Sequence, residues 1–153
     1  MTEGRAVTRA FAKDTAVPAA QSRSEIERLL IRYGATSFVS GWSEGVATIL
    51  FEAEGRRLRF DLPLPSVGDE MFTKSRDRMR ACEAEARRRW RALVLVIKAK
   101  LEAVESGITT FEEEFLSHIV VPGGKTFGEL AIPQIAEAYE RGVSMPPLLG
   151  GGS

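Results

Sequence analysis

A chain of 153 residues is long enough to bury one hydrophobic core without the help of disulfide bonds. Its single cysteine, Cys82, excludes an internal disulfide and any metal site built from several cysteines, and it fits a reducing compartment. No segment has the apolar length of a signal peptide or of a membrane span, so we expect a cytoplasmic protein that has no membrane partner.

The formal net charge is zero, but the charges are unevenly distributed along the chain. Residues 1–55 carry 6 basic and 7 acidic side chains, residues 56–100 carry 13 and 6, and residues 101–153 carry 2 and 8. A basic middle segment of this kind predicts a surface that attracts nucleic acid. The acidic C-terminal part equally well neutralises that surface if it folds back against it, and the sequence leaves both alternatives open.

Residues 1–21 show no clean hydrophobic periodicity, and we interpret them as a flexible N-terminal arm. Ser22 and Glu25 have the spacing of a capping box, which predicts that a helix begins at Ser22. Gly34 is expected to end this helix, because glycine readily adopts the left-handed conformation. Its apolar stripe consists of Ile26, Leu29, Leu30 and Tyr33.

Three strands are predicted over residues 35–42, 46–53 and 56–62, joined by short turns that contain Gly45 and Gly55. The third strand has the cleanest alternation. Leu58, Phe60 and Leu62 are expected to face the core, and Arg57, Arg59 and Asp61 to face outward.

A long amphipathic helix is predicted over residues 75–106, followed by a stop at Gly107. Steps of three and four residues align its apolar side. That side consists of Met79, Cys82, Ala86, Trp90, Leu93, Val94, Ile97, Leu101 and Val104. At 1.5 Å per residue the helix would be about 45 Å long, so we expect one end to project or to meet a partner.

Two further helices are predicted after Gly107, over residues 110–120 and 126–141. Thr110 and Glu113 form a capping box for the first of them, and "VVPGGKT" between them is a loop or a small hairpin tip. The buried side of the last helix is expected to consist of Phe127, Leu130, Ile135, Ala138 and Tyr139.

The resulting fold class is α+β: an α-β-β-β-α core, in which a three-stranded antiparallel meander packs on one long helix, followed by two short C-terminal helices. We assign residues 22–145 to a single domain and residues 146–153 to a flexible tail.

No catalytic constellation is visible in the sequence. His118 is the only histidine and lies in the apolar segment "FLSHIVV", which indicates a packed side chain. Glu112, Glu113 and Glu114 occupy successive helical positions about 100° apart and do not converge on one cation. We therefore predict neither catalytic residues, nor a metal site, nor a cofactor, and we do not expect an enzyme.

Two other features have a weak chemical signature. Residues 123–126, Gly-Gly-Lys-Thr, resemble the end of a phosphate-binding loop, but the first glycine of that motif is replaced by Ile119, so a turn is the better interpretation. Cys82 has Arg80 nearby, which could lower the pKa of its thiol. Without a histidine partner, Cys82 is interpreted as a small residue on the long helix.

Arginine residues form the one pattern that stands out. They lie at the start and on the outward face of the third strand and in the middle of the long helix, and the planar guanidinium pairs well with phosphate. Trp42 would add a surface for base stacking. The predicted nucleic-acid-binding residues are Arg56, Arg57, Arg59, Arg87, Arg88, Arg91 and Trp42. The alternative is a solvated charged face.

The order α-β-β-β-α is that of double-stranded-RNA-binding domains, a likeness of topology only. Three segments carry a closer resemblance: "RRRWRALVLVIKAKLEAVESGITTFEEEFLSHIVVPGGKTFGEL" (residues 87–130), "EIERLLIRYGATSF" and "GRRLRFDLPLP". They resemble a family of small uncharacterised proteins encoded by phages and prophages, over most of residues 18–149. The resemblance implies a bacterial host cell, where small phage proteins commonly bind nucleic acid or host proteins, and it transfers no activity.

These observations predict a non-enzymatic accessory protein of phage or prophage type that binds nucleic acid through a basic strand-plus-helix surface, with DNA and RNA both open. The alternative is a protein-binding module, either an inhibitor or adaptor of a host factor or a homodimer formed through the long helix.

Overall fold

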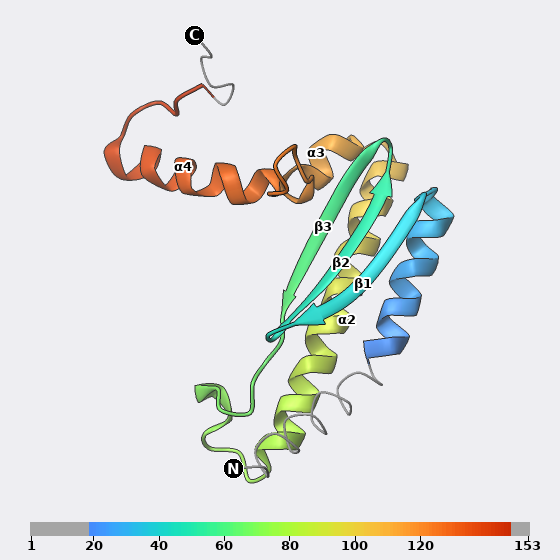
Figure 1. Cartoon of the computed structure of the whole chain (residues 1–153), viewed down its shortest axis with the longest axis vertical. Helices are drawn as coiled ribbons and strands as arrows, with labels where there is room; N and C mark the ends of the chain where they lie inside the picture. Colours follow the sequence, from blue (N-terminus) through green and yellow to red (C-terminus); the bar gives the residue numbers. More distant parts are fainter. Residues whose placement is uncertain (1–18, 148–153) are drawn as a thin grey trace.

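The computed structural model describes residues 19–147, and it confirms the predicted α+β fold (Figure 1). A first helix covers residues 19–33. It is followed by β1 (Ser37–Ser43), β2 (Val46–Ala53), β3 (Arg56–Pro63), the 3-10 helix η1 (Glu70–Phe72), α2 (Arg78–Glu105), α3 (Phe111–Phe115), the 3-10 helix η2 (Leu116–His118) and α4 (Phe127–Arg141). Residues 1–18 and 148–153 lie outside the described residues, and with them most of the predicted arm and tail.

The first helix begins earlier than predicted. Residues 19–21 are already helical and Ala19 is buried at 6% exposure, seven residues before the buried Ile26 on the same side of the helix. Ser22 therefore lies inside the helix, and the predicted capping box with Glu25 is wrong. The predicted end is confirmed: Gly34 has a φ of 110°, and its amide donates to the carbonyl of Leu30 at 3.1 Å.

The three strands form an antiparallel meander in the order β1-β2-β3. Both connections are two-residue turns, Glu44-Gly45 and Glu54-Gly55, and all four residues have positive φ. Such turns match the right-handed twist of the flanking strands, which fixes the register. Phe51 of β2 consequently pairs with Phe38 of β1 on one side and with Leu58 of β3 on the other.

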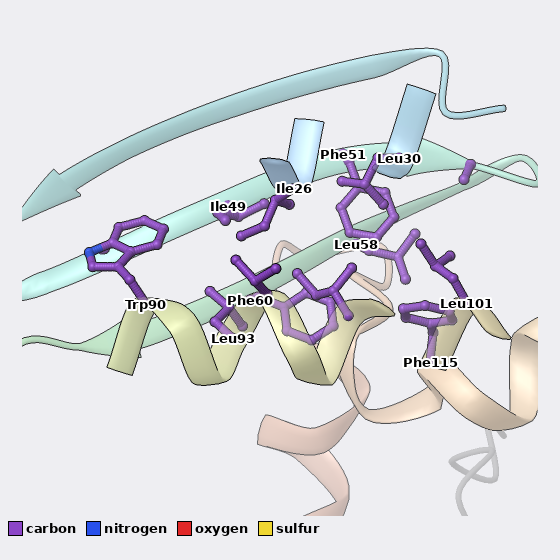
Figure 2. Close-up of a cluster of buried hydrophobic side chains, with 14 of the residues drawn as sticks. Ile26, Leu30, Ile49, Phe51, Leu58, Phe60, Trp90, Leu93, Leu101 and Phe115 are labelled. Carbon is purple, nitrogen blue, oxygen red and sulfur yellow. The ribbon is translucent and has the colours of Figure 1, made fainter. Parts of the chain in front are cut away.

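One face of the sheet carries the core. The first helix and α2 run side by side across this face, and no helix of residues 19–147 lies across the opposite face (Figure 1). Figure 2 shows the layer between them, where side chains from the sheet meet Ile26, Leu30 and the apolar side of α2. The buried set of α2 is Cys82, Ala86, Trp90, Leu93, Val94, Ile97 and Leu101, as the periodicity predicts. Full burial of each large side chain contributes about 1.5–3 kcal/mol.

The long helix α2 begins at Arg78, three residues later than predicted, because Asp77 provides its N-cap: the carboxylate accepts a hydrogen bond from the amide of Arg80 at 3.1 Å. Its 28 residues span about 42 Å at 1.5 Å per residue. The first turns extend beyond the end of the sheet (Figure 1), so the predicted core residue Met79 is 36% exposed. Gly107, with a φ of 78°, follows the helix as expected.

The helix predicted over residues 110–120 is shorter than expected. Thr110 caps α3 through a bond from the amide of Glu113 at 3.2 Å, but the chain passes into η2 after Phe115. Beyond η2 the backbone extends along the edge of β3, where the amide of Val120 donates to the carbonyl of Arg57 at 2.8 Å. This pairing with the sheet competes with further helical bonds. The next turn is the predicted hairpin tip, closed by a bond from Val121 N to Lys125 O at 2.9 Å.

The last helix, α4, contacts the rest of the described chain mainly near its start, where it meets η2, and projects away from the sheet (Figure 1). Gly128 and Ala131 are buried where α4 meets η2. The predicted buried side is wrong for most of the helix, because Leu130 and Ile135 are each 41% exposed and Tyr139 is 86% exposed. Periodicity identified an apolar side correctly, but it does not specify what covers that side.

The contact between Gly128 and η2 yields a first prediction. A Cβ at Gly128 would lie 2.8 Å from the carbonyl oxygen of Ser117, so Gly128→Ala forces the two elements apart. Overpacking of this kind costs about 1–3 kcal/mol, more than the gain in helix propensity from alanine. We expect a lower free energy of unfolding in urea titrations. Ala136→Gly, on the exposed part of α4, measures the difference in helix propensity between alanine and glycine without any packing contact. A Gly128→Ala protein as stable as the parent would contradict the close contact with Ser117.

Candidate nucleic-acid interface

Arg59 is held in place by three partners. Its Nε donates to Asp61 at 3.2 Å and its Nη1 to the carbonyl of Gly124 at 3.1 Å, while Nη2 pairs with Glu129. The side chain is only 21% exposed. Arg59 therefore joins β3 to the hairpin tip and to the first turn of α4, and its guanidinium has little capacity left for a phosphate.

The other two arginines of β3 are also paired with carboxylates. Arg57 lies opposite Glu52 in the sheet register, with 3.3 Å between Nη2 and Oε1. Arg56 contacts Glu112 of α3 at 2.9 Å. Both arginines remain about half exposed or more and line a shallow open cleft with the hairpin tip. The predicted outward face of β3 is therefore present, but its positive charge is largely balanced.

The turn of residues 123–126 is a hairpin and helix start, as predicted, and not a phosphate-binding loop. Gly123 and Gly124 have φ values of 107° and 92°, which glycine adopts without strain. Thr126 is 7% exposed, and its hydroxyl accepts a bond from the amide of Glu129 at 3.2 Å as the N-cap of α4. The Glu129 amide is therefore not free to donate to a phosphate.

Trp42 does not lie beside Arg57 and Arg59. It pairs with Ala47, whose side chain is buried on the helix-covered face, so alternation along the strand directs Trp42 to that face as well. Trp42 is nevertheless 61% exposed, because it is the penultimate residue of β1. Arg57 and Arg59 face the opposite side of the sheet.

The predicted arginines of α2 lie on the helix layer, away from the outward face of β3. Arg88 pairs with Glu85, which also accepts from Arg89 at 3.0 Å. Burial by itself would raise the pKa of Glu85, but these hydrogen bonds and charges outweigh it and lower that pKa. Arg91 contacts Glu25 of the first helix at 2.6 Å, and Arg87 is exposed. The seven predicted residues therefore occupy separate regions on both sides of the sheet, and the continuous strand-plus-helix surface is not formed.

A different basic surface emerges on the two helices. Arg80, Arg87, Arg91 and Lys98 follow one another at spacings of 7, 4 and 7 residues, which places them on one side of α2 over about 27 Å. The contact between Arg91 and Glu25 shows that this side meets the first helix. Arg28 and Arg32 follow Glu25 by three and seven residues and share its side of that helix. We call this set of six cations the helix-layer surface.

The helix-layer surface retains most of its charge. Of the six cations, only Arg91 forms an ion pair with another residue in 19–147, and all six are exposed. The spacing of the cations along α2 is visible in the sequence. The sequence does not show that the first helix packs beside them, because that contact depends on how both helices cross the sheet.

The acidic C-terminal part neutralises other cations. Glu112 pairs with Arg56, Glu129 with Arg59, and Glu114 with Lys100 at 3.3 Å. The acidic C-terminal part therefore neutralises β3 and the end of α2, and within residues 19–147 it forms no ion pair with the helix-layer surface.

His118 is a packed side chain within the fold. Its ring stacks on Phe60 with 3.8 Å between centroids, and Nδ1 donates to the carbonyl of Arg59 at 3.3 Å. Burial lowers the pKa of His118, and the charge of Lys100 acts in the same direction, whereas the bond to Arg59 and the charge of Asp61 oppose it. The neutral ring is thus the favoured form.

Cys82 is fully buried, and burial raises the pKa of its thiol to about 11. The charge of Asp69 adds to that effect. Loss of solvation outweighs the nearby cations, so Arg80 does not lower this pKa, and Cys82 is a small buried residue of the long helix, as interpreted from the sequence. Within residues 19–147 no three His, Cys, Asp or Glu side chains converge as metal ligands. Nor does any helix in that range have the length and apolar character to cross a membrane.

Comparisons of the chain with protein-family models, with curated proteins and with solved structures found no match.

The pairing of the β3 arginines gives a second prediction. Arg59→Ala removes one charged partner from each of Asp61 and Glu129 and the donor to Gly124, whereas Arg57→Ala removes one exposed pair. Exposed pairs contribute about 0–1 kcal/mol and less exposed charged hydrogen bonds about 1.5–3 kcal/mol. We expect Arg59→Ala to lower the free energy of unfolding by about 2 kcal/mol more than Arg57→Ala in urea titrations. Equal losses would contradict the assigned role of Arg59.

His118 gives a third prediction. The unfolded chain takes up a proton near pH 6.5, while the folded ring resists protonation, so stability is complete above that pH and falls as the pH drops through the lower folded pKa. We expect the free energy of unfolding to decrease between pH 7.5 and 5.5. Because His118 is the only histidine, His118→Phe keeps the aromatic stack on Phe60 and should flatten this dependence. An unchanged slope in the variant would refute the assignment.

Proposed function

We propose that this protein is a non-enzymatic accessory protein of phage or prophage type that binds nucleic acid through the helix-layer surface. The observation that supports this function is the stripe of exposed cations on one side of α2, at Arg80, Arg87, Arg91 and Lys98, beside Arg28 and Arg32 of the first helix. A surface that carries so little compensating acid attracts a polyanion.

The contact would be directed to the phosphate backbone. Five of the six cations are arginines, whose planar fork pairs with two phosphate oxygens at once, and the stripe on α2 is about 27 Å long. That length covers several successive phosphates of either strand, at about 3.4 Å per phosphate along a helix axis. Phosphate contacts position a protein without reading sequence, so binding should tolerate changes of sequence and weaken steeply with salt.

The arrangement of the core adds a topological argument. Two helices lie together on one face of a three-stranded meander, in the element order shared with double-stranded-RNA-binding domains. Likeness of topology does not carry function by itself. It is the reason to include duplex RNA among the probes.

The fourth prediction concerns the double variant Arg87→Glu with Lys98→Glu. Both residues are exposed and have no ion pair within residues 19–147, so the fold should persist. We expect fluorescence anisotropy with labelled single- and double-stranded DNA and RNA to show binding at about 50 mM salt that weakens strongly by about 200 mM. The variant should lose at least about tenfold in affinity, and the slope of log affinity against log salt should fall by about 2.

Arg57→Glu with Lys125→Glu is the matched control, because it changes the net charge equally at exposed positions on the β3 and hairpin side of the molecule. We expect it to bind within about threefold of the parent. If the control loses as much affinity as the helix-layer variant, this surface is wrong. If the parent binds none of the four probes at low salt, the nucleic-acid function itself is refuted.

A protein-binding module is the second candidate function. The observation in its favour is the apolar side of α4, at Ile132, Ile135 and Tyr139, which no other element within residues 19–147 covers. An inhibitor or adaptor of a host factor would use such a helix as its contact.

A further inference from the structure

The projecting part of α4 exposes a coherent apolar stripe. Ile132 is 63% exposed, Ile135 41% and Tyr139 86%, and their spacings of three and four residues align them on one side of the helix. Ala136 and, beyond the helix, Val143 extend the same stripe. The stripe continues the side that packs against η2 through Gly128 and Ala131, but it lies beyond the reach of that contact.

The charges beside the stripe are acidic. Residues 127–141 contain Glu129, Glu137 and Glu140 against the single base Arg141, a net charge of −2. Glu137 and Glu140 are exposed, and Glu137 pairs with Arg141 at 3.0 Å. A complementary surface would therefore present an apolar strip of similar length beside positive charge.

The back of α2 has this composition. Opposite the sheet, Leu95 is 52% exposed and Val96 44%, with the exposed small residues Ala92 and Ala99 on the same side. Arg88, 73% exposed at its side chain, precedes the strip by about one turn. Over residues 78–105 the helix carries eight basic and four acidic side chains, a net charge of +4.

We propose that the projecting half of α4 docks on the back of α2 of a second copy of this chain. The apolar strips correspond in length: residues 132–139 and residues 92–99 each advance seven positions, about 10 Å. The acidic flank of α4 meets the basic flank of α2. The same chain does not make this contact, because α4 is anchored at η2 beside the edge of β3 and leaves the body from there (Figure 1).

Two such contacts form in a twofold dimer, in which each chain gives its arm and receives that of its partner. This arrangement buries the large exposed side chains of both strips, and tyrosine is a residue type that often dominates interface energy. The exposed strip of residues 92–99 on α2 lies next to the helix-layer surface but consists of different side chains, so the two proposals are tested with different variants.

The experiment uses three variants of the full chain, measured by size-exclusion chromatography with light scattering over a range of concentrations, without nucleic acid. The arm variant carries Ile132→Lys and Tyr139→Lys, and the patch variant carries Leu95→Glu. Val39→Lys is the control, because Val39 is 60% exposed on the edge strand β1, and an open strand edge is the other kind of surface through which two copies pair. All four positions are exposed, so circular dichroism should report an unchanged fold.

We expect the parent and Val39→Lys to be dimers, and the arm and patch variants each to be monomers at concentrations where the parent is dimeric. A mixture of the arm and patch variants should regain a dimer, because the intact arm of one chain meets the intact strip of the other, while the second contact pairs lysine with glutamate. The mixed dimer is detected by a tag on one variant.

Three results would overturn the inference. A monomeric parent protein would show that α4 does not dock on a second copy of the chain. A patch variant that stays dimeric while the arm variant does not would assign the contact to pairing between two α4 helices. Loss of the dimer in Val39→Lys would assign it to the edge of the sheet.

Discussion

The fold depends on the burial of one face of the sheet beneath two helices. Ile49 and Phe51 of β2 are each 1% exposed, and Ile97 of α2 and Ile26 of the first helix are fully buried against them. Because the meander has only three strands, it gains little stability from its own ladder and needs this apolar layer. The two primed turns set the register that keeps these side chains on the same face, and a slip by one residue would direct them to the solvent.

This layer also divides the charges of the chain. On the open face of β3, Arg59 comes within reach of the C-terminal segment that runs along the strand edge and pairs with Glu129, while Arg57 pairs with Glu52 of the neighbouring strand β2. Side chains on the outer surface of the helices meet no such segment within residues 19–147. A chain with zero net charge consequently has a nearly balanced sheet side and a basic helix side, and the second is the better candidate for a phosphate contact.

The projecting helix α4 follows from the same geometry. Val120 pairs with the edge of β3, which directs the chain outward, and the close approach of Gly128 to Ser117 fixes where the next helix begins. The buried part of α4 is therefore limited to its first turns. The remainder keeps an apolar side that is typical of a packed helix, and the proposed dimer gives that side a partner.

Local patterns in the sequence are enough to predict most of the elements and the apolar side of each. Alternation in β3, the periodicity of α2 and the capping threonines Thr110 and Thr126 are local properties, which depend on residues a few positions apart. Which cations share a surface depends instead on how distant segments pack together. Arg57 and Arg87 are equally basic in the sequence, yet Arg57 faces Glu52, whereas Arg87 is exposed on the side of α2 that meets the first helix. Contacts between distant segments depend on the strand register and on how the helices cross the sheet.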